Sequence, residues 1–179
     1  MQRLVILGSA GAGKSTLATV LGGMLGLPVV HLDRFYWRPG WVMTPLEEGD
    51  ALARAALAEP SWVMDGNWSR TVPERLQACD TVIYLDLPTW VCLWRILQRR
   101  VQYHGRIRPD LAPGCYEKLD WEFVQWVLTF RRRKRKEIMG WLEQAQAAGK
   151  RVELLQTHRE VRRFVAGLDL ASKAKLMGH

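Results

Sequence analysis

A glycine-rich segment near the N-terminus constrains the fold of this chain more than any other feature. Residues 8–15 read GSAGAGKS and match the pattern GxxxxGK[ST] at every position. A short apolar run at residues 3–7 precedes this segment, and apolar residues at helical spacing follow it over residues 14–25. In a strand–loop–helix context, such glycines let backbone N–H groups cradle phosphates at the positive end of the helix. The sequence therefore predicts a phosphate-binding loop, against the alternative of a glycine-rich turn that binds no nucleotide.

The phosphate loop predicts which ligands the protein binds and which residues contact them. We expect Lys14 to reach the β- and γ-phosphates of ATP, and the Ser15 hydroxyl to bind Mg²⁺. ATP and Mg²⁺ are therefore the expected cofactors. The residues expected to contact the nucleotide are Gly8, Ser9, Ala10, Gly11, Ala12, Gly13, Lys14, Ser15 and Thr16.

Four further apolar runs of strand length follow, at residues 29–32, 61–64, 81–85 and 152–155, with helical patterns between them. This alternation predicts an α/β fold of three layers, in which a five-stranded parallel sheet has helices on both faces. Ligands of such sheets bind beyond the carboxyl ends of the strands. Three carboxylates, Asp33, Asp65 and Asp86, directly follow strand ends. A magnesium–phosphate site needs carboxylates at this edge.

Capping patterns mark two helix starts. Thr44, Pro45 and Glu47 predict a capping box for a helix that runs to about residue 58. Thr157 and Glu160 predict a second box for the last helix. Between them we expect a helix over 89–103 and a long helical region over 119–148 that is broken once.

Length and composition limit the class of protein. With 179 residues, 48 % of them apolar, the chain fits one domain over residues 1–170, followed by a flexible tail over 171–179. Three widely spaced cysteines exclude a disulfide framework and a zinc site, and favour a cytoplasmic protein. No apolar run approaches the ~18 residues of a membrane helix, so we expect no membrane partner.

The net charge of +8 lies in one segment. Residues 95–136 hold 12 Lys or Arg and 4 Asp or Glu, and the remaining residues are balanced. Such a segment suits a small polyanion such as a triphosphate, because arginine forks bind phosphate oxygens in pairs. A nucleic-acid partner is the alternative that a basic run such as RRRKRK (131–136) leaves open.

With these features the chain resembles P-loop kinases of the adenylate and nucleoside kinase type. More narrowly, it resembles the small adenylate-kinase-like proteins called DNA topology modulation proteins. The motifs that carry the narrower resemblance are HLDRFYWRPGW (31–41), DGNWSRT (65–71), LWRILQRR (93–100) and FRRRKRKEI (130–138). With the phosphate loop, the resemblance covers about residues 1–167. It implies the strand order 2-3-1-4-5 and a mobile lid over about residues 104–118.

The resemblance also implies roles for three residues outside the phosphate loop. Asp33 is the implied general base or acceptor-positioning residue, with a simple loop or capping carboxylate as the alternative. Asp65 is the implied second magnesium residue, with a turn-forming Asp-Gly as the alternative. Arg70 is implied to grip an acceptor phosphate, although DGNWSRT has one residue more than the DGFPRT of adenylate kinases, which shifts Arg70. We rank Asp86 below Asp65 as a magnesium residue.

Arginines of the basic segment are implied to close over the triphosphate. Arg99 is preferred on the helix before the lid because Arg95, four residues earlier, shares its face. In the long helix, Arg131 and Arg135 form the implied inward pair at the same spacing. Arg106 and Arg108 lie in the expected lid itself. For each residue of the 131–136 run, a solvated helix face is the alternative.

The acceptor side is less determined. Trp37, Trp41 and Trp68 lie in loops expected to cover the acceptor, where they either stack on a base or sugar or simply pack the loops. Arg38 and Arg70 favour an anionic acceptor, hence a nucleotide.

We expect a phosphotransferase that moves the γ-phosphoryl group of MgATP to a nucleotide, nucleoside or similar acceptor. The alternative is a nucleotide-dependent nucleic-acid-binding or regulatory protein with weak ATPase activity. The expected oligomeric state is monomer or dimer.

Overall fold

Five parallel strands form the centre of the protein, seen here in a computed structural model that describes residues 1–105, 110–117 and 119–177, with side chains up to residue 170. The strands are β1 (Arg3–Gly8), β2 (Val29–His31), β5 (Trp62–Asp65), β6 (Thr81–Leu85) and β7 (Arg151–Leu155). Their order across the sheet is β2-β5-β1-β6-β7, and all four neighbouring pairs are parallel. Counted along the chain within this sheet, the order is 2-3-1-4-5, so the predicted fold class and strand order are confirmed.

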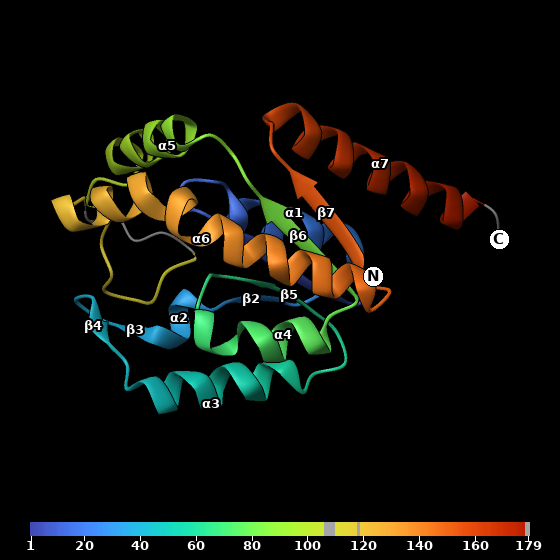
Figure 1. The fold of residues 1–179 in the computed structure, drawn as a ribbon, viewed down its shortest axis with the longest axis horizontal. Coiled ribbons are helices and arrows are strands. Elements are labelled where there is room, and N and C mark those ends of the chain that lie inside the picture. Colours follow the sequence, from blue (N-terminus) through green and yellow to red (C-terminus); the bar gives the residue numbers. More distant parts are fainter. Residues whose placement is uncertain (106–109, 118, 178–179) are drawn as a thin grey trace.

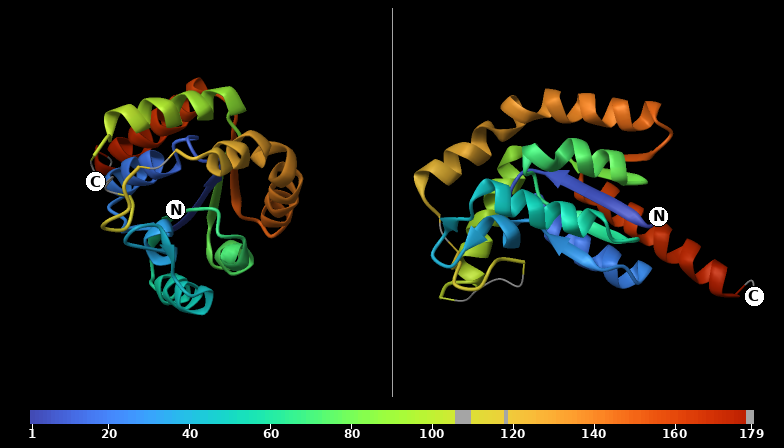
Figure 2. Two further views of the ribbon diagram at one scale, coloured as in Figure 1. Left: turned by 90° about the vertical axis from the view of Figure 1, so that its left-hand side faces the viewer. Right: turned by 90° about the horizontal axis from the view of Figure 1, so that it is seen from below.

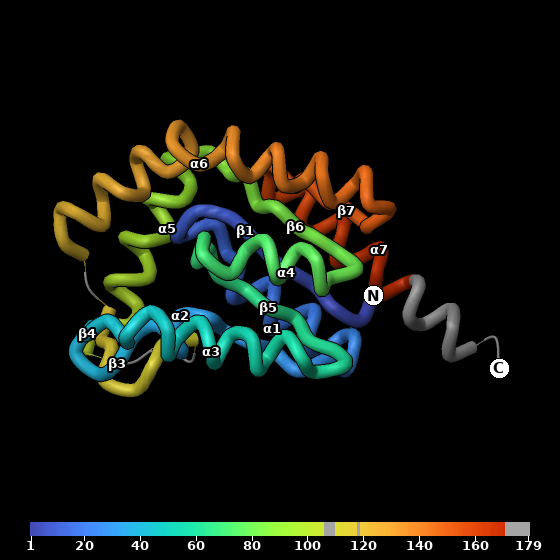
Figure 3. Tube along the Cα trace, turned by 60° about the horizontal axis from the view of Figure 1, so that its bottom comes forward, coloured from blue at the N-terminus to red at the C-terminus, as the bar shows by residue number. Residues whose placement is uncertain are grey.

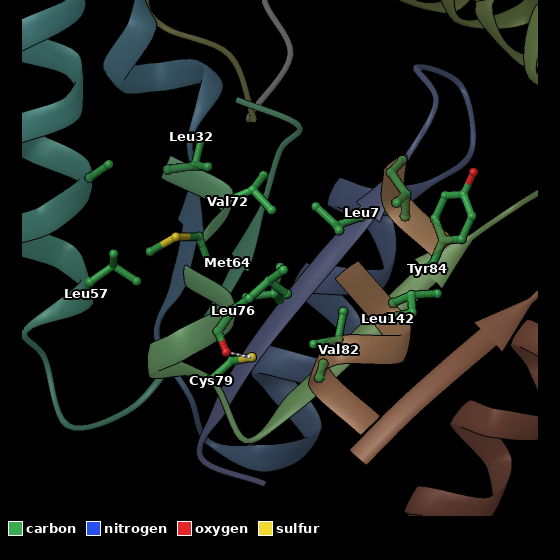
Figure 4. Packing of buried hydrophobic residues seen from close by; sticks show 14 of the residues in the cluster. Leu7, Leu32, Leu57, Met64, Val72, Leu76, Cys79, Val82, Tyr84 and Leu142 are labelled. Carbon is green, nitrogen blue, oxygen red and sulfur yellow. Dashed lines mark hydrogen bonds between the residues drawn. The ribbon is translucent and has the colours of Figure 1, made fainter. Parts of the chain in front are cut away.

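Helices cover both faces of the sheet (Figures 1 and 2). One face carries α1 (Lys14–Leu25), α5 (Thr89–Gln102) and α7 (His158–Met177), and the other carries α3 (Leu46–Leu57), α4 (Val72–Ala78) and α6 (Trp121–Ala147). Successive residues of a strand point to opposite faces. In β1, Val5 and Leu7 therefore pack under α4 and α6, whereas Leu4 and Ile6 pack under α1 and α5. Figure 4 shows the first of these two cores.

The helix boundaries correct two expectations. The capping box at Thr44 is wrong: α3 begins at Leu46, Pro45 occupies the capping position, and no side chain caps the helix. Thr44 instead follows strand β4, and its backbone N–H donates to the Tyr36 carbonyl at 3.0 Å. The expected break in the long helix is also wrong, because α6 runs without interruption from an N-cap at Asp120.

The second capping box is confirmed. The backbone N–H of Glu160 donates to Thr157 Oγ1 at 3.2 Å, and the Thr157 N–H donates to Glu160 Oε2 at 3.3 Å. The helix that it starts, α7, continues to Met177, past residue 170 where we expected the tail to begin. No helix of the described chain is both long and apolar enough to cross a membrane.

Short elements gather at the carboxyl ends of β2, β5 and β1. They are α2 (Asp33–Tyr36), the antiparallel hairpin of β3 (Trp37–Arg38) and β4 (Val42–Met43), and the 3-10 turn η1 (Ser69–Thr71). In Figure 1, α2 and the hairpin lie at the left end of the molecule. The sequence predicts only a loop rich in aromatic residues over residues 34–41, RFYWRPGW. The helix α2 and the hairpin are therefore elements that only the structure shows.

Residues 110–117, part of the expected lid, rest on this hairpin (Figure 3). Three hydrogen bonds join them: Gly40 N–H to the Gly114 carbonyl at 3.1 Å, Trp41 Nε1 to the Tyr116 carbonyl at 2.7 Å, and Cys115 Sγ to the Arg38 carbonyl at 3.2 Å. Leu111, Ala112 and Cys115 form a small buried cluster against Trp37 and Trp41. Residues 110–117 therefore pack on the hairpin near the carboxyl end of the sheet. Arg106 and Arg108 lie outside the described residues.

Candidate functional site

The phosphate loop has the backbone conformation that its glycines permit. Gly11 and Gly13 have φ angles of 77° and 96°, in the left-handed region that side chains disfavour. A Cβ on Gly11 would also collide with the backbone carbonyl of Cys92 in α5. The loop thus packs directly on α5, and α1 begins at Lys14 with its free N–H groups facing the loop.

Lys14 lies where the carboxylates of the site converge. Its Nζ donates to the Ser9 carbonyl at 3.0 Å, so the ammonium group turns back across the loop. Burial lowers the pKa of Lys14, and the negative charges of Asp33 and Asp65 partly oppose that effect. Both carboxylates therefore lie within electrostatic reach of the loop lysine, as the sequence predicts.

Asp65 ends β5 and joins two side chains from neighbouring elements. Ser15 Oγ donates to Asp65 Oδ2 at 2.7 Å, and His31 Nδ1 lies 2.6 Å from Asp65 Oδ1. Asp65 is only 4 % exposed, so these contacts fix its carboxylate. The hydroxyl and the carboxylate are hard oxygen donors of the kind that Mg²⁺ accepts, with the remaining positions left to water and nucleotide phosphates. The described residues hold no cluster of three or more metal-ligating His, Cys, Asp or Glu.

A cleft at the carboxyl end of the sheet is lined by Lys14, Ser15 and Asp33, and Asp33 lies at the start of α2. Its Oδ1 accepts a hydrogen bond of 3.0 Å from Trp68 Nε1. The Trp68 ring stacks on Tyr36, with ring centroids 3.9 Å apart and an interplanar angle of 13°. The carboxylate is therefore held by an indole that is itself fixed by packing.

Two residues that the sequence analysis missed fix the segment after β5. Asn67 clamps the start of the phosphate loop: Gly8 N–H donates to its Oδ1 at 3.2 Å, and its Nδ2 donates to the Gly8 carbonyl at 2.6 Å. Arg75 of α4 is fully buried and donates to the carbonyls of Gly66 and Trp68, at 2.8 and 2.9 Å. Burial lowers the pKa of Arg75 to about 10. Only the Asn within DGNWSRT gives a sequence signal for this clamp.

Arg95 and Arg99 of α5 line the cleft from the opposite side. Arg95 Nη1 donates to the Ala12 carbonyl in the phosphate loop at 3.1 Å. Arg99 Nε donates to Glu117 Oε1 at 2.6 Å, and its positive charge helps to lower the pKa of Lys14. The shared helical face predicted for this pair thus points toward the phosphate loop.

The structure places Arg131 and Arg135 differently from the expected inward pair. Both contact Asp86 at the end of β6, with Nε-to-carboxylate distances of 3.0 and 2.9 Å. The pair shares a face as its spacing predicts, but that face meets a buried carboxylate and not the cleft. Their contact with the nucleotide remains a prediction.

Arg70 is likewise engaged outside the cleft. Its Nε donates to Asp50 Oδ2 at 2.8 Å, and Asp50 also accepts from the Tyr36 hydroxyl at 2.6 Å. The structure therefore brings together Lys14, Ser15, Asp33, Asp65 and Arg99, and leaves Arg70, Arg131 and Arg135 apart from them.

Comparison with known proteins agrees with this architecture. No family model matches the chain. An adenylate kinase from Symbiobacterium thermophilum is 27 % identical over 157 residues, which covers 68 % of this chain and 73 % of that protein. Among solved structures, a gluconokinase from Sinorhizobium meliloti 1021 superposes with a TM-score of 0.54 at 15 % identity, covering 99 % of this chain and 97 % of that one.

A shikimate kinase from Acinetobacter baumannii, in complex with shikimate, superposes with a TM-score of 0.55 at 18 % identity, covering 98 % of this chain and 96 % of that one. These likenesses confirm the P-loop kinase fold. Together with the adenylate kinase relative, they support the expected ATP-dependent kinase and leave its acceptor unspecified. They give no support to the nucleic-acid alternative.

Proposed function

We propose that this protein transfers the γ-phosphoryl group of ATP to a hydroxyl group of a small acceptor. The observation that carries the proposal is the convergence of Lys14, the Ser15–Asp65 pair and Asp33 on one cleft at the carboxyl end of the sheet. Phosphoryl transfer needs little beyond positioning and charge stabilisation, and these groups supply both.

In this proposal the two sides of the cleft have separate tasks. The loop N–H groups and Lys14 bind the β- and γ-phosphates, while Arg95 and Arg99 approach from α5 and offset the charge of the transferring group. Ser15 and Asp65 would hold Mg²⁺, which when bound neutralises phosphate charge. Residues 110–117 and the hairpin exclude water, which suppresses hydrolysis of ATP.

Asp33 acts on the acceptor. The acceptor oxygen forms a bond to the γ-phosphorus, the bond from that phosphorus to the β–γ bridging oxygen breaks, and ADP leaves. The hydroxyl proton passes to the Asp33 carboxylate, which the Trp68 indole holds in place.

A coupled assay of ADP release tests the proposal, run with ATP, Mg²⁺ and a panel of nucleosides, nucleotides and sugar alcohols. We expect one acceptor class to raise turnover well above acceptor-free hydrolysis. Lys14→Ala should lower that turnover by about 100-fold or more, and Asp33→Asn should lower kcat by about 100- to 1000-fold with little change in the KM for ATP.

Glu59→Gln is the matched control, because it neutralises an exposed carboxylate that follows α3 and does not line the cleft. Its turnover should equal that of the unchanged protein. If no acceptor raises turnover and Lys14→Ala leaves hydrolysis unchanged, the proposal is wrong.

A further inference from the structure

The outward face of α5 carries a row of large apolar side chains that are exposed to solvent. On its inward face, Cys92 and Ile96 are buried against the phosphate loop and the sheet. Four apolar residues lie on the opposite face and are between 48 % and 79 % exposed. They form what we call the α5 stripe: Trp90, Trp94, Leu97 and Val101. Figures 1 and 2 show α5 at the outer edge of the molecule.

The spacing of the α5 stripe is typical of a helix that pairs with another helix. Its members follow one another at intervals of four, three and four residues, which is the 3.5-residue period of a coiled-coil seam. At 100° per residue, the four side chains lie within a sector of about 60°. A helix that packs on a broad apolar surface has a stripe of about 100° or more. The narrow α5 stripe therefore favours a single facing helix over a wide apolar surface such as a lipid layer.

The α5 stripe is complementary to a second copy of itself. A two-fold axis through the middle of the stripe makes the two α5 helices antiparallel. Trp90 then faces Val101 of the partner subunit, and Trp94 faces Leu97 of the partner subunit. Each large indole thus lies opposite a smaller aliphatic side chain, which lets the two stripes interdigitate. A parallel pair would instead place each indole against the same indole.

The arginines of α5 do not oppose this pairing. Arg95 and Arg99 line the cleft, on the other side of the helix. Arg100 borders the α5 stripe, and in the antiparallel register it faces Val91 of the partner subunit. The two Arg100 side chains are then about 13 Å apart along the helix axes. This distance exceeds the Debye length of about 8 Å at physiological salt, so their repulsion is screened.

The exposed area is sufficient for a dimer of modest affinity. The four side chains expose roughly 450 Å² in each copy, at about 200 Å² for a whole Trp and less for Leu and Val. With the side chains that flank the stripe, two copies would bury about 1,200 Å² in total, the lower end of the range for specific interfaces. Interfaces of that size support dissociation constants in the micromolar range.

From these features we infer that the protein forms a two-fold symmetric dimer in which the α5 stripes of two copies pack against each other in antiparallel register. The interface is separate from the site of the proposed phosphotransferase. Among the described residues that line the cleft, none belongs to the α5 stripe. The inference therefore does not rest on the proposed function.

Sedimentation velocity over a range of protein concentrations tests the inference. At physiological salt we expect the mass of a dimer at about 100 μM and its dissociation on dilution. Trp94→Lys and Leu97→Glu should each raise the dissociation constant by at least 10-fold, because each places a charge in an apolar seam. Leu52→Glu is the matched control, since Leu52 is an exposed leucine of α3, on the other face of the sheet, and this variant should dimerise normally.

Mixing the two charged variants tests the antiparallel register. In that register the lysine of Trp94→Lys lies opposite the glutamate of Leu97→Glu, and the second pair of the seam keeps its native Trp94 and Leu97. The mixture should therefore form a heterodimer at least 10-fold more tightly than either variant pairs with itself. Circular dichroism checks that each variant is folded, and Trp90→Ala is a milder substitution that should weaken the dimer without adding a charge.

Three results would overturn the inference. The first is a monomer at every concentration, including a monomer that binds anionic lipid vesicles and loses that binding in Leu97→Glu. The second is a dimer that all the α5 variants retain, which would place the interface elsewhere. The third is a mixture of the two charged variants that stays monomeric, because the antiparallel register requires their pairing.

Discussion

Asp86 offers a sharp test of how the basic segment is used. Its side chain is 1 % exposed at the carboxyl end of β6, where it accepts hydrogen bonds from Arg131, Arg135 and Gln156. These contacts join the basic run of α6 to the sheet. We expect Asp86→Asn to destabilise the fold, because it removes the charge that both arginines neutralise while it keeps the size of the side chain.

The expected loss of unfolding free energy follows from how far Asp86 and its two arginine partners are buried. Hydrogen bonds to a charged group contribute about 1.5–3 kcal/mol each when both partners are buried. The arginine side chains are 44 % and 40 % exposed, so water compensates part of the loss, and we take about 1 kcal/mol for each arginine. With the weaker Gln156 contact at 3.3 Å, the free energy of unfolding should fall by about 2–3 kcal/mol. In a domain of this size that lowers the Tm by about 4–12 °C.

Urea denaturation of Asp86→Asn, Arg131→Ala and the double variant measures this effect. The double-mutant cycle should give a coupling energy of about 1 kcal/mol between the two residues. Glu137→Gln is the control, since it removes only an exposed ion pair with Lys134 and should cost about 0.5 kcal/mol or less.

The opposite pattern would refute the reasoning. It would consist of unchanged stability in Asp86→Asn, together with a 100-fold loss of kcat in a fully stable Arg131→Ala protein. Arg131 would then act on the nucleotide, and its contact with Asp86 would contribute little to the fold.

Two further predictions concern the same framework. Burial raises the pKa of Asp86, but the bonds from its arginines and Gln156 outweigh burial and hold the pKa below its usual value. The stability it contributes is therefore present above the unfolded-state pKa of about 4 and is lost as the pH falls below it, so the urea midpoint should drop less on acidification in Asp86→Asn. In the phosphate loop, Gly11→Ala should abolish ATP binding and destabilise the fold by about 2 kcal/mol or more, because its φ is 77° and a Cβ would strike the Cys92 carbonyl. Gly23 lies inside α1, and a Cβ added there would meet no described atom within 4 Å apart from its chain neighbours and its own helix backbone. Gly23→Ala should therefore stabilise the fold by about 0.5–1 kcal/mol, which thermal unfolding and ATP titration would show. Equal effects of the two glycine substitutions would contradict this account.

Local patterns determined a large part of this protein. The phosphate loop requires left-handed backbone at Gly11 and Gly13, and glycine supplies it wherever the chain goes next. Alternating apolar strands and helices fix a parallel sheet, and the carboxyl ends of parallel strands share one edge. For that reason the sequence predicts Asp33 and Asp65 at the same edge of the sheet as Lys14.

Local patterns failed where a residue had a choice of partners. Thr44 has the sequence of a helix cap, yet its backbone bonds to Tyr36 and its side chain caps nothing. Arg131 and Arg135 have the spacing of an inward pair, and the sequence alone could not tell a phosphate from the carboxylate of Asp86 as their target. Long polar side chains reach several candidate partners, and only the packed structure fixes the distances that select one.

The sequence by itself thus determined the sheet, the phosphate loop and the carboxylates at its edge, because backbone conformation and burial depend on short, regular patterns. Only the tertiary structure decided how the acceptor side is built. The docking of residues 110–117 on the hairpin joins segments far apart in the chain. The ion pairs of Arg38 and Arg70 join separate elements. Their geometry depends on how those segments pack, and no local pattern in the sequence determines that packing.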